Sequence, residues 1–381
     1  MINNNTDRLG YYLVGEKKFR NKTLALMESF RTRYQPQWIF NHDVYGSIDW
    51  TIPIEESLLS IYRRRAQQLR DQYDYLVLYF SGGADSMNIL HAFMDNNIFL
   101  DEIVMQLPKL VEPKLNDQDL TNGNIHSEIK YSAVPFLQKY ISQLSGTRIT
   151  YQDFSKNVIE LLEKDDWADL VPMTTNITVS GIGRQLAPLA EQHILTMCGQ
   201  GRRVAQILGI DKPLVWYDGK NYLGFFLDLN VTHSPAVDIA YMHKQDDLIG
   251  RYYTTELFYW TPDMPEIVIK QCQEIKKNCE ADRAKQYLWS QMHNLHISAF
   301  RSTMHPIIYP GQETPEFQTD KPTSSVRRWQ DQWFWDTASD RVIGNYMSVI
   351  GHLKKYIDDY QAIDNDIMNG LQGHCSPYYK L

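Results

Sequence analysis

The chain of 381 residues carries 38 Lys and Arg against 46 Asp and Glu, which gives a formal net charge of −8. Its 43% hydrophobic and 22% charged residues are typical of a globular protein and exclude a disordered or collagen-like chain. No run of about 18 apolar residues is present, so we expect no membrane-spanning helix. The first ten residues lack the basic and apolar segments of a secretory signal, and the four cysteines form no CxxC pair. These features predict a cytoplasmic protein without disulfides.

The chain divides into three regions of different sequence texture. Residues 1–72 are predicted to be a mainly helical segment, with a helix over 53–73 whose first turn contains Pro53. Residues 73–230 alternate apolar runs with helical periodicity and are predicted to form an α/β domain. Residues 231–381 are predicted to be mainly helical again.

In the middle region the predicted elements alternate between strands and helices. The run Tyr75–Phe80 is continuously apolar, as in a strand that is buried on both faces. The βαβαβ order predicts a parallel twisted sheet with helices on both faces. The turn Asp218-Gly219 predicts a β-hairpin between 213–217 and 222–227, appended to this sheet. The other predicted strands are 102–107, 147–154 and 193–198, and the predicted helices are 86–94, 126–144 and 158–163.

The third region combines helical stripes with an excess of aromatic residues. Cys272 and Cys279 lie on one apolar stripe at helical spacing, so we predict that they are core residues rather than ligands. The chain has 24 tyrosines, a number that the composition does not explain. Many aromatic residues lie in the segments 252–260 and 329–335, where we expect the substrate pocket.

One motif carries specific chemistry, and it occupies residues 81–86 directly after the strongest predicted strand. Two glycines, Gly82 and Gly83, let the backbone turn tightly and approach a ligand closely. The first N–H groups of the helix that follows have no partners, and with the helix dipole they form an anion site. Asp85 would repel an anion alone, so its presence predicts a Mg²⁺ ion between the carboxylate and phosphate groups.

The sequence Ser-Gly-Gly-Ala-Asp-Ser resembles the SGGxDS pyrophosphate-binding loop of the PP-loop, or N-type, ATP pyrophosphatases. This superfamily includes asparagine, GMP and NAD synthetases and several tRNA-modifying enzymes. The resemblance implies an adenine nucleotide alpha hydrolase-like fold and a reaction that adenylates a carboxylate, carbonyl or amide oxygen and releases pyrophosphate. A nitrogen nucleophile then displaces AMP. The residues that the resemblance assigns to ATP and Mg²⁺ are Ser81, Gly82, Gly83, Ala84, Asp85 and Ser86, with adenine seated at Val104 and Met105.

Three cations are weaker candidates for the same site. Arg202 and Arg203 follow Gly199-Gln200-Gly201 after the predicted strand 193–198, which would bring them to the same edge of the sheet as the motif. There they could clamp a phosphate or a carboxylate; the alternative is a solvated pair at a helix start. Lys212 could neutralise the departing pyrophosphate, as lysines do in several superfamily members, or could belong to a turn before the next strand.

Three functions remain open from the sequence. The first is an ATP-dependent ligase or synthetase of the kind just described. The second is a sulfur-transfer or PAPS reductase-like enzyme that uses Cys375, which lies near the C-terminus. The third is a non-catalytic ATP-binding module. We expect a small-molecule substrate and nucleophile; tRNA is a less favoured partner because the net charge is −8 and no RNA-binding module is recognisable.

Overall fold

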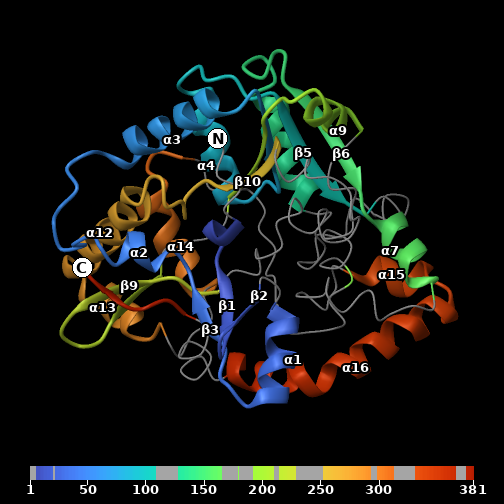
Figure 1. Cartoon of the computed structure of the whole chain (residues 1–381). Helices are drawn as coiled ribbons and strands as arrows, with labels where there is room; N and C mark the ends of the chain where they lie inside the picture. Colours follow the sequence, from blue (N-terminus) through green and yellow to red (C-terminus); the bar gives the residue numbers. More distant parts are fainter. Residues whose placement is uncertain are drawn as a thin grey trace.

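The computed structural model describes residues 6–19, 22–108, 128–164, 179, 192–209, 214–228, 252–292, 298–312, 331–365 and 375–381 (Figure 1). At its centre is a sheet of five parallel strands in the order β10-β7-β4-β5-β6. Numbered along the chain, the strands of this sheet run 3-2-1-4-5, so the chain begins in the middle, grows to one side and then crosses to the other. The strands are β4 (Tyr75–Tyr79), β5 (Glu102–Leu107), β6 (Arg148–Asp153), β7 (Val204–Leu208) and β10 (Tyr253–Leu257).

Helices cover both faces of this sheet, as the alternate side chains of β4 show by packing in two different clusters. Leu76 and Leu78 pack in the main core with α3 (Leu58–Gln72) and α4 (Ala84–Met94). Val77 points to the other face, where it packs with Ile194 and Cys198 of α9 (Gln192–Gly199). The predicted α/β class, with a parallel sheet and helices on both faces, is therefore confirmed.

The predicted strand over 193–198 was wrong, because this segment is the helix α9. The strand follows it, at β7, after a turn in which Gly201 adopts a φ of 79°. A short apolar run does not by itself distinguish a buried strand from a buried helix. The predicted strands 75–80, 102–107 and 147–154 are confirmed as β4, β5 and β6, and the helices 86–94 and 158–163 as α4 and α7 (Ser155–Leu162). Of the helix predicted over 126–144, the structure describes a turn of π-helix at Ile129–Ala133 and α6 (Val134–Lys139).

Two further differences concern the predicted hairpin and the edge of the central sheet. The hairpin of β8 (Leu214–Tyr217) and β9 (Tyr222–Phe225) forms as predicted, but it is not appended to the central sheet. It pairs instead with β11 (Tyr379–Lys380) at the end of the chain, in a separate antiparallel sheet. The central sheet gains β10 from the region predicted to be helical.

The N-terminal segment was predicted to be mainly helical, yet it contains a three-stranded antiparallel sheet. The order is β2 (Lys17–Phe19), β1 (Tyr11–Val14) and β3 (Gln37–Ile39). Strands of three or four residues are too short to show an alternating pattern. The helical elements of this segment are η1 (Thr6–Leu9), α1 (Lys22–Thr32), α2 (His42–Tyr45) and α3. Ser57 caps α3 through the N–H of Ser60, so Pro53 lies before this helix and not in its first turn.

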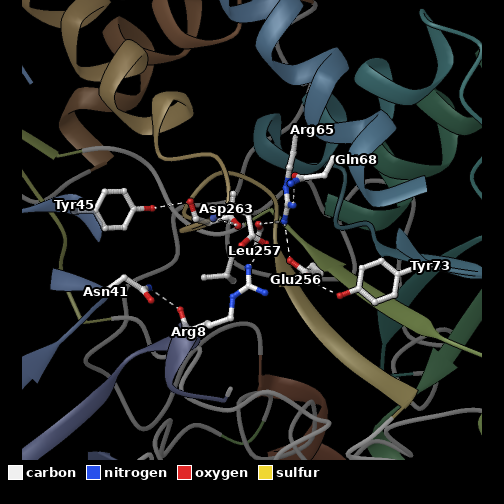
Figure 2. A network of polar contacts seen from close by, with 10 residues as sticks. Arg8, Asn41, Tyr45, Arg65, Gln68, Tyr73, Glu256, Leu257 and Asp263 are labelled. Atoms are coloured by element: carbon white, nitrogen blue, oxygen red, sulfur yellow. Dashed lines mark hydrogen bonds and ion pairs between the residues drawn. The ribbon is translucent and has the colours of Figure 1, made fainter. Parts of the chain in front are cut away.

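A network of polar contacts ties β10 and the residues that follow it to α3 and to the N-terminal segment (Figure 2). Arg65 of α3, with no exposed side-chain surface, donates to Oε2 of Glu256 at 2.8 Å. The hydroxyl of Tyr73 donates to the other oxygen of the same carboxylate at 2.5 Å. Arg8 of η1 pairs with Asp263, which lies beyond the carboxyl end of β10. Because burying a charge is costly, the bonds from Arg65 and Tyr73 are what allow Glu256 to lie inside the protein.

The aromatic excess is explained by packing between the three regions. Phe226 of the middle region has its ring centroid 4.5 Å from that of Tyr45 and 4.8 Å from that of Trp260. Trp50 stacks on Tyr379 of β11 at 4.5 Å. These rings are buried, so they form a core and not a pocket. The remaining helices are α12 (Glu266–Glu280), α13 (Arg283–Ser290), α14 (Ser298–Ile308), α15 (Gln332–Thr337) and α16 (Asp340–Asn365).

Two predictions about the third region can be checked directly. Cys272 and Cys279 of α12 are each 1% exposed and belong to the main core, as predicted. Trp333 and Phe334 of α15 are also buried, in a second core with α7 and α16, so these two rings of the segment 329–335 do not line a pocket. Among the helices of the described residues, none has the length and apolar character needed to cross a membrane.

Candidate active site

The motif Ser81–Ser86 lies at the carboxyl end of β4 and continues into α4. From β4 the chain passes to β5 on one side, whereas β7, the neighbour on the other side, is reached only after β6. The motif therefore lies at the point where the strand order reverses. In open parallel sheets, ligands bind at this point, in the crevice outside the carboxyl ends of the strands.

Gly82 can only be glycine in this structure. Its φ is +77°, a region that residues with a Cβ rarely adopt. A Cβ added there would lie 2.5 Å from the backbone nitrogen of Ala133 and 2.8 Å from its Cα. The hydroxyl of Ser132 donates to the Gly82 oxygen at 2.7 Å. The loop is thus pressed against the segment Ile129–Ala133, which fixes its shape from outside.

The start of α4 presents backbone donors to the loop. Gly83 is the N-cap, and the first intrahelical bond runs from Met87 N–H to its oxygen at 3.0 Å. The N–H groups of the first helical turn, at residues 84–86, therefore have no acceptor within the helix. The hydroxyl of Ser81 accepts from Gly83 N–H at 3.3 Å, and that of Ser86 donates to the Gly83 oxygen at 3.0 Å. This arrangement suits an anion, with Ser86 stabilising the turn rather than facing outward.

Asp85 is held by two tyrosines from the third region. Tyr309 donates its hydroxyl to Oδ1 of the carboxylate, and Tyr259 donates to the Asp85 backbone oxygen at 2.9 Å. The two rings lie 5.7 Å apart, and Asn88 of α4 donates to the Tyr259 hydroxyl at 2.7 Å. Burial raises the pKa of both tyrosines well above the ordinary value, and the nearby Asp85 charge raises it further. Both phenols therefore remain protonated donors at neutral pH.

A second carboxylate, Glu128, lies beside the loop. It is 3% exposed, and its Oε1 is 3.8 Å from the place that a Cβ of Gly83 would occupy. Two carboxylates beside an anion-binding loop are electrostatically unfavourable for phosphate alone. They fit Mg²⁺, which prefers carboxylate and phosphate oxygens. Among the described residues, no group of three or more His, Cys, Asp and Glu side chains is arranged to hold a metal ion.

Val104 and Met105, predicted to seat adenine, lie inside β5 with their backbone in the sheet. They are 4% and 0% exposed. The Val104 oxygen accepts from Phe80 N–H at 2.8 Å, and Met105 is opposite Tyr151 of β6.

Arg202 and Arg203 do not share an edge with the loop, so this prediction was wrong. The backbone N–H of Arg203 donates to Oδ2 of Asp74 at 2.8 Å, and Arg202 donates to the Asp74 oxygen at 3.1 Å. Asp74 precedes β4, so both arginines lie at the amino edge of the sheet, opposite the loop. The error follows from the misassigned strand, because the arginines precede β7 instead of following a strand.

The carboxyl end of β7 is what approaches the loop. A Cβ on Gly209 would stand 3.3 Å from the carbonyl carbon and 3.4 Å from the Cβ of Asp85. The chain therefore leaves β7 beside the motif, and Gly209 lies at the site. Lys212, the predicted partner of pyrophosphate, lies outside the described residues.

Cys375 belongs to a different part of the molecule from the loop. Its backbone forms an isolated antiparallel β-bridge with that of Leu227, next to the sheet of β8, β9 and β11. Burial raises the pKa of its thiol to about 11, which disfavours the reactive thiolate at neutral pH. Cys375 is partly buried, whereas Cys198, Cys272 and Cys279 are buried.

No family model matches the chain, and no curated protein does so either. The site therefore rests on its own geometry. Four residues of the site were not predicted from the sequence: Glu128, Ser132, Tyr259 and Tyr309. Only Tyr259 carried a signal, since it belongs to the aromatic segment 252–260 where the substrate pocket was expected.

Proposed function

We propose that the chain is an ATP pyrophosphatase of the ligase type, which cleaves ATP between the α and β phosphates. The observation that carries the proposal is the left-handed Gly82 loop at the reversal point of a 3-2-1-4-5 parallel sheet, with Asp85 in the first turn of the next helix. The strand order and the loop support the proposal of an adenine nucleotide alpha hydrolase-like fold.

In this proposal each group at the loop has a distinct task. The backbone amides of the first turn of α4 bind the pyrophosphate end of ATP, aided by the helix dipole. Asp85 and Glu128 would hold Mg²⁺, which supplies charge neutralisation as negative charge develops on the departing pyrophosphate. Tyr309 and Tyr259 hold Asp85 in place through the side chain and the backbone respectively. A substrate oxygen attacks the α phosphorus, pyrophosphate departs, and a nitrogen nucleophile then displaces AMP.

A non-catalytic ATP-binding module is the second candidate, and the position of the arginines favours it. Arg202 and Arg203 lie at the opposite edge, so neither can assist the departing pyrophosphate. That task would fall to Lys212 or to Mg²⁺ alone. The sulfur-transfer alternative is disfavoured because the Cys375 thiol is held neutral by burial and lies against the separate sheet.

The experiment measures pyrophosphate release from ATP and Mg²⁺ with pools of amino acids, nucleosides and amines. We expect release with at least one pool and its loss in Asp85→Ala. The matched control is Asp95→Ala, at the other end of α4, where 60% of the carboxylate side chain is exposed; it should retain activity. Tight ATP binding without pyrophosphate from any pool would favour the binding module. Equal activity in both variants would refute the assigned role of Asp85.

A further inference from the structure

The hydrogen bond from Tyr309 to Asp85 joins residues that are 224 positions apart in the chain. Tyr309 follows the last residue of α14, and its side chain reaches the first turn of α4. The tyrosine is 4% exposed, so it has no solvent-facing role. A long-range contact that ends on the one carboxylate of the motif calls for an explanation beyond packing.

The surroundings of Tyr309 hold its phenol in one position. The preceding carbonyl, of Ile308, accepts the hydroxyl of Tyr62 at 2.6 Å, and the Tyr309 N–H donates to the His305 oxygen at 2.8 Å. Three residues further on, Gln312 donates to the side chain of Asn88 in α4 at 2.5 Å. Contacts on both sides of Tyr309 therefore fix its backbone relative to α4.

Tyr259 provides a natural comparison, because it is equally buried and adjacent but contacts a different atom. It donates to the backbone oxygen of Asp85, which the helix already positions. Tyr309 alone of the two donates to the carboxylate, whose rotation the helix does not fix. A carboxylate that coordinates a metal is oriented by hydrogen bonds from outside the coordination shell, and loss of such a bond typically costs about 10–100-fold in metal affinity.

We propose that Tyr309 is a positioning residue that fixes the Asp85 carboxylate and thereby sets the affinity of the site for the divalent cation of the metal–nucleotide complex. This inference rests on the proposed function, because it requires the cation at Asp85. It adds that the C-terminal region completes the nucleotide site, although the motif itself lies entirely in the middle region.

The test measures Mn²⁺ binding by electron paramagnetic resonance in the presence of α,β-methylene-ATP, an analogue that cannot be cleaved between the α and β phosphates. Tyr309→Phe should weaken Mn²⁺ binding about 10–100-fold, whereas affinity for the metal-free analogue should remain within about twofold. Tyr259→Phe, which removes the bond to the Asp85 backbone oxygen and not the one to its carboxylate, should weaken Mn²⁺ binding by less than Tyr309→Phe does. Thermal unfolding of both variants shows that they fold. Gln312→Ala, which loosens the segment that carries Tyr309, should show a smaller loss in the same direction and replaces Tyr309→Phe if that variant does not fold.

Four results would overturn the inference in distinguishable ways. If Tyr309→Phe binds Mn²⁺ as the original protein does, Tyr309 does not position the ligand, and the proposed function stands. If Tyr259→Phe loses as much affinity as Tyr309→Phe, the hydrogen bond to the carboxylate has no role beyond that of the bond to the backbone, and the inference fails. If Tyr309→Phe does not fold and Gln312→Ala binds Mn²⁺ undiminished, the segment has no role in positioning Asp85. If Asp85→Asn binds Mn²⁺ as tightly as the original protein, the cation is not at Asp85, and the metal site of the proposed function fails together with the inference.

Discussion

Replacing Gly82 with alanine tests whether this glycine is held in the left-handed conformation against Ala133, which the sequence motif alone does not predict. The motif treats its two glycines alike, but the structure does not. Gly82 has a φ of +77°, whereas Gly83 has φ −80° and ψ 162°, which any residue can adopt. A methyl group on Gly82 would also meet the backbone of Ala133 at 2.5 Å.

The magnitude follows from two additive costs. The left-handed conformation costs a residue with a Cβ about 1–2 kcal/mol. Forcing extra volume against a backbone that cannot rotate away costs about a further 1–3 kcal/mol. We therefore expect Gly82→Ala to lower the free energy of unfolding by about 2–5 kcal/mol. A methyl on Gly83 would lie 3.3 Å from the Ser81 hydroxyl, which can move, so its cost should stay below about 1 kcal/mol.

Urea unfolding of three variants checks this reasoning. Gly219→Ala is the control for strain alone, since Gly219 has a φ of +96° and nothing within 4 Å of the added Cβ. The expected order of destabilisation is Gly82→Ala, then Gly219→Ala, then Gly83→Ala. If Gly82→Ala costs no more than Gly219→Ala, the loop is not pressed against Ala133, and the reasoning is refuted.

Three further predictions concern other parts of the molecule. Glu256→Gln should lower the free energy of unfolding in urea by about 3–5 kcal/mol, because it leaves the Arg65 charge buried without its counter-ion (Figure 2); a loss below about 1 kcal/mol would show that the pair is solvated. Iodoacetamide should label Cys375 slowly at pH 7.5 and faster as the pH approaches 11, because its raised pKa keeps the thiol neutral below that value; rapid labelling at pH 7.5 would restore the sulfur-transfer alternative. The double variant Arg202→Ala/Arg203→Ala should keep its ATP affinity within about twofold of the original protein, because both residues lie at the amino edge of the sheet. Calorimetry measures this affinity, and a loss of about tenfold, or about 1.4 kcal/mol, would contradict that placement.

The strands that the sequence predicted are those whose burial is visible in the local composition. β4 and β5 are short apolar runs that end in turn signals, and a parallel sheet buries both faces of each. β10 was missed because the central residues of Tyr-Thr-Thr-Glu-Leu are polar, whereas those of β5 are apolar. Glu256 is 3% exposed in that strand only because Arg65, 191 positions earlier, neutralises it. No local pattern contains that information.

The same distinction applies to the site. The loop was predicted because six consecutive residues carry its chemistry and because a strand precedes it. The groups that surround it come from distant segments: Glu128 and Ser132 from the helix after β5, and Tyr309 from the end of α14. Arg202 and Arg203 were assigned to the wrong edge because their position depended on whether 193–198 is a strand or a helix, which six apolar residues do not decide.

We propose that ATP is cleaved at this loop between the α and β phosphates. The most direct test incubates the protein with ATP labelled with ³²P at the α phosphate, Mg²⁺ and the substrate pool that gives the most pyrophosphate, and separates the labelled products. We expect label in AMP or in an adenylated substrate, with none in ADP, and no labelled product with Asp85→Ala. Label in ADP would mean that ATP is cleaved between the β and γ phosphates and would refute the proposed function.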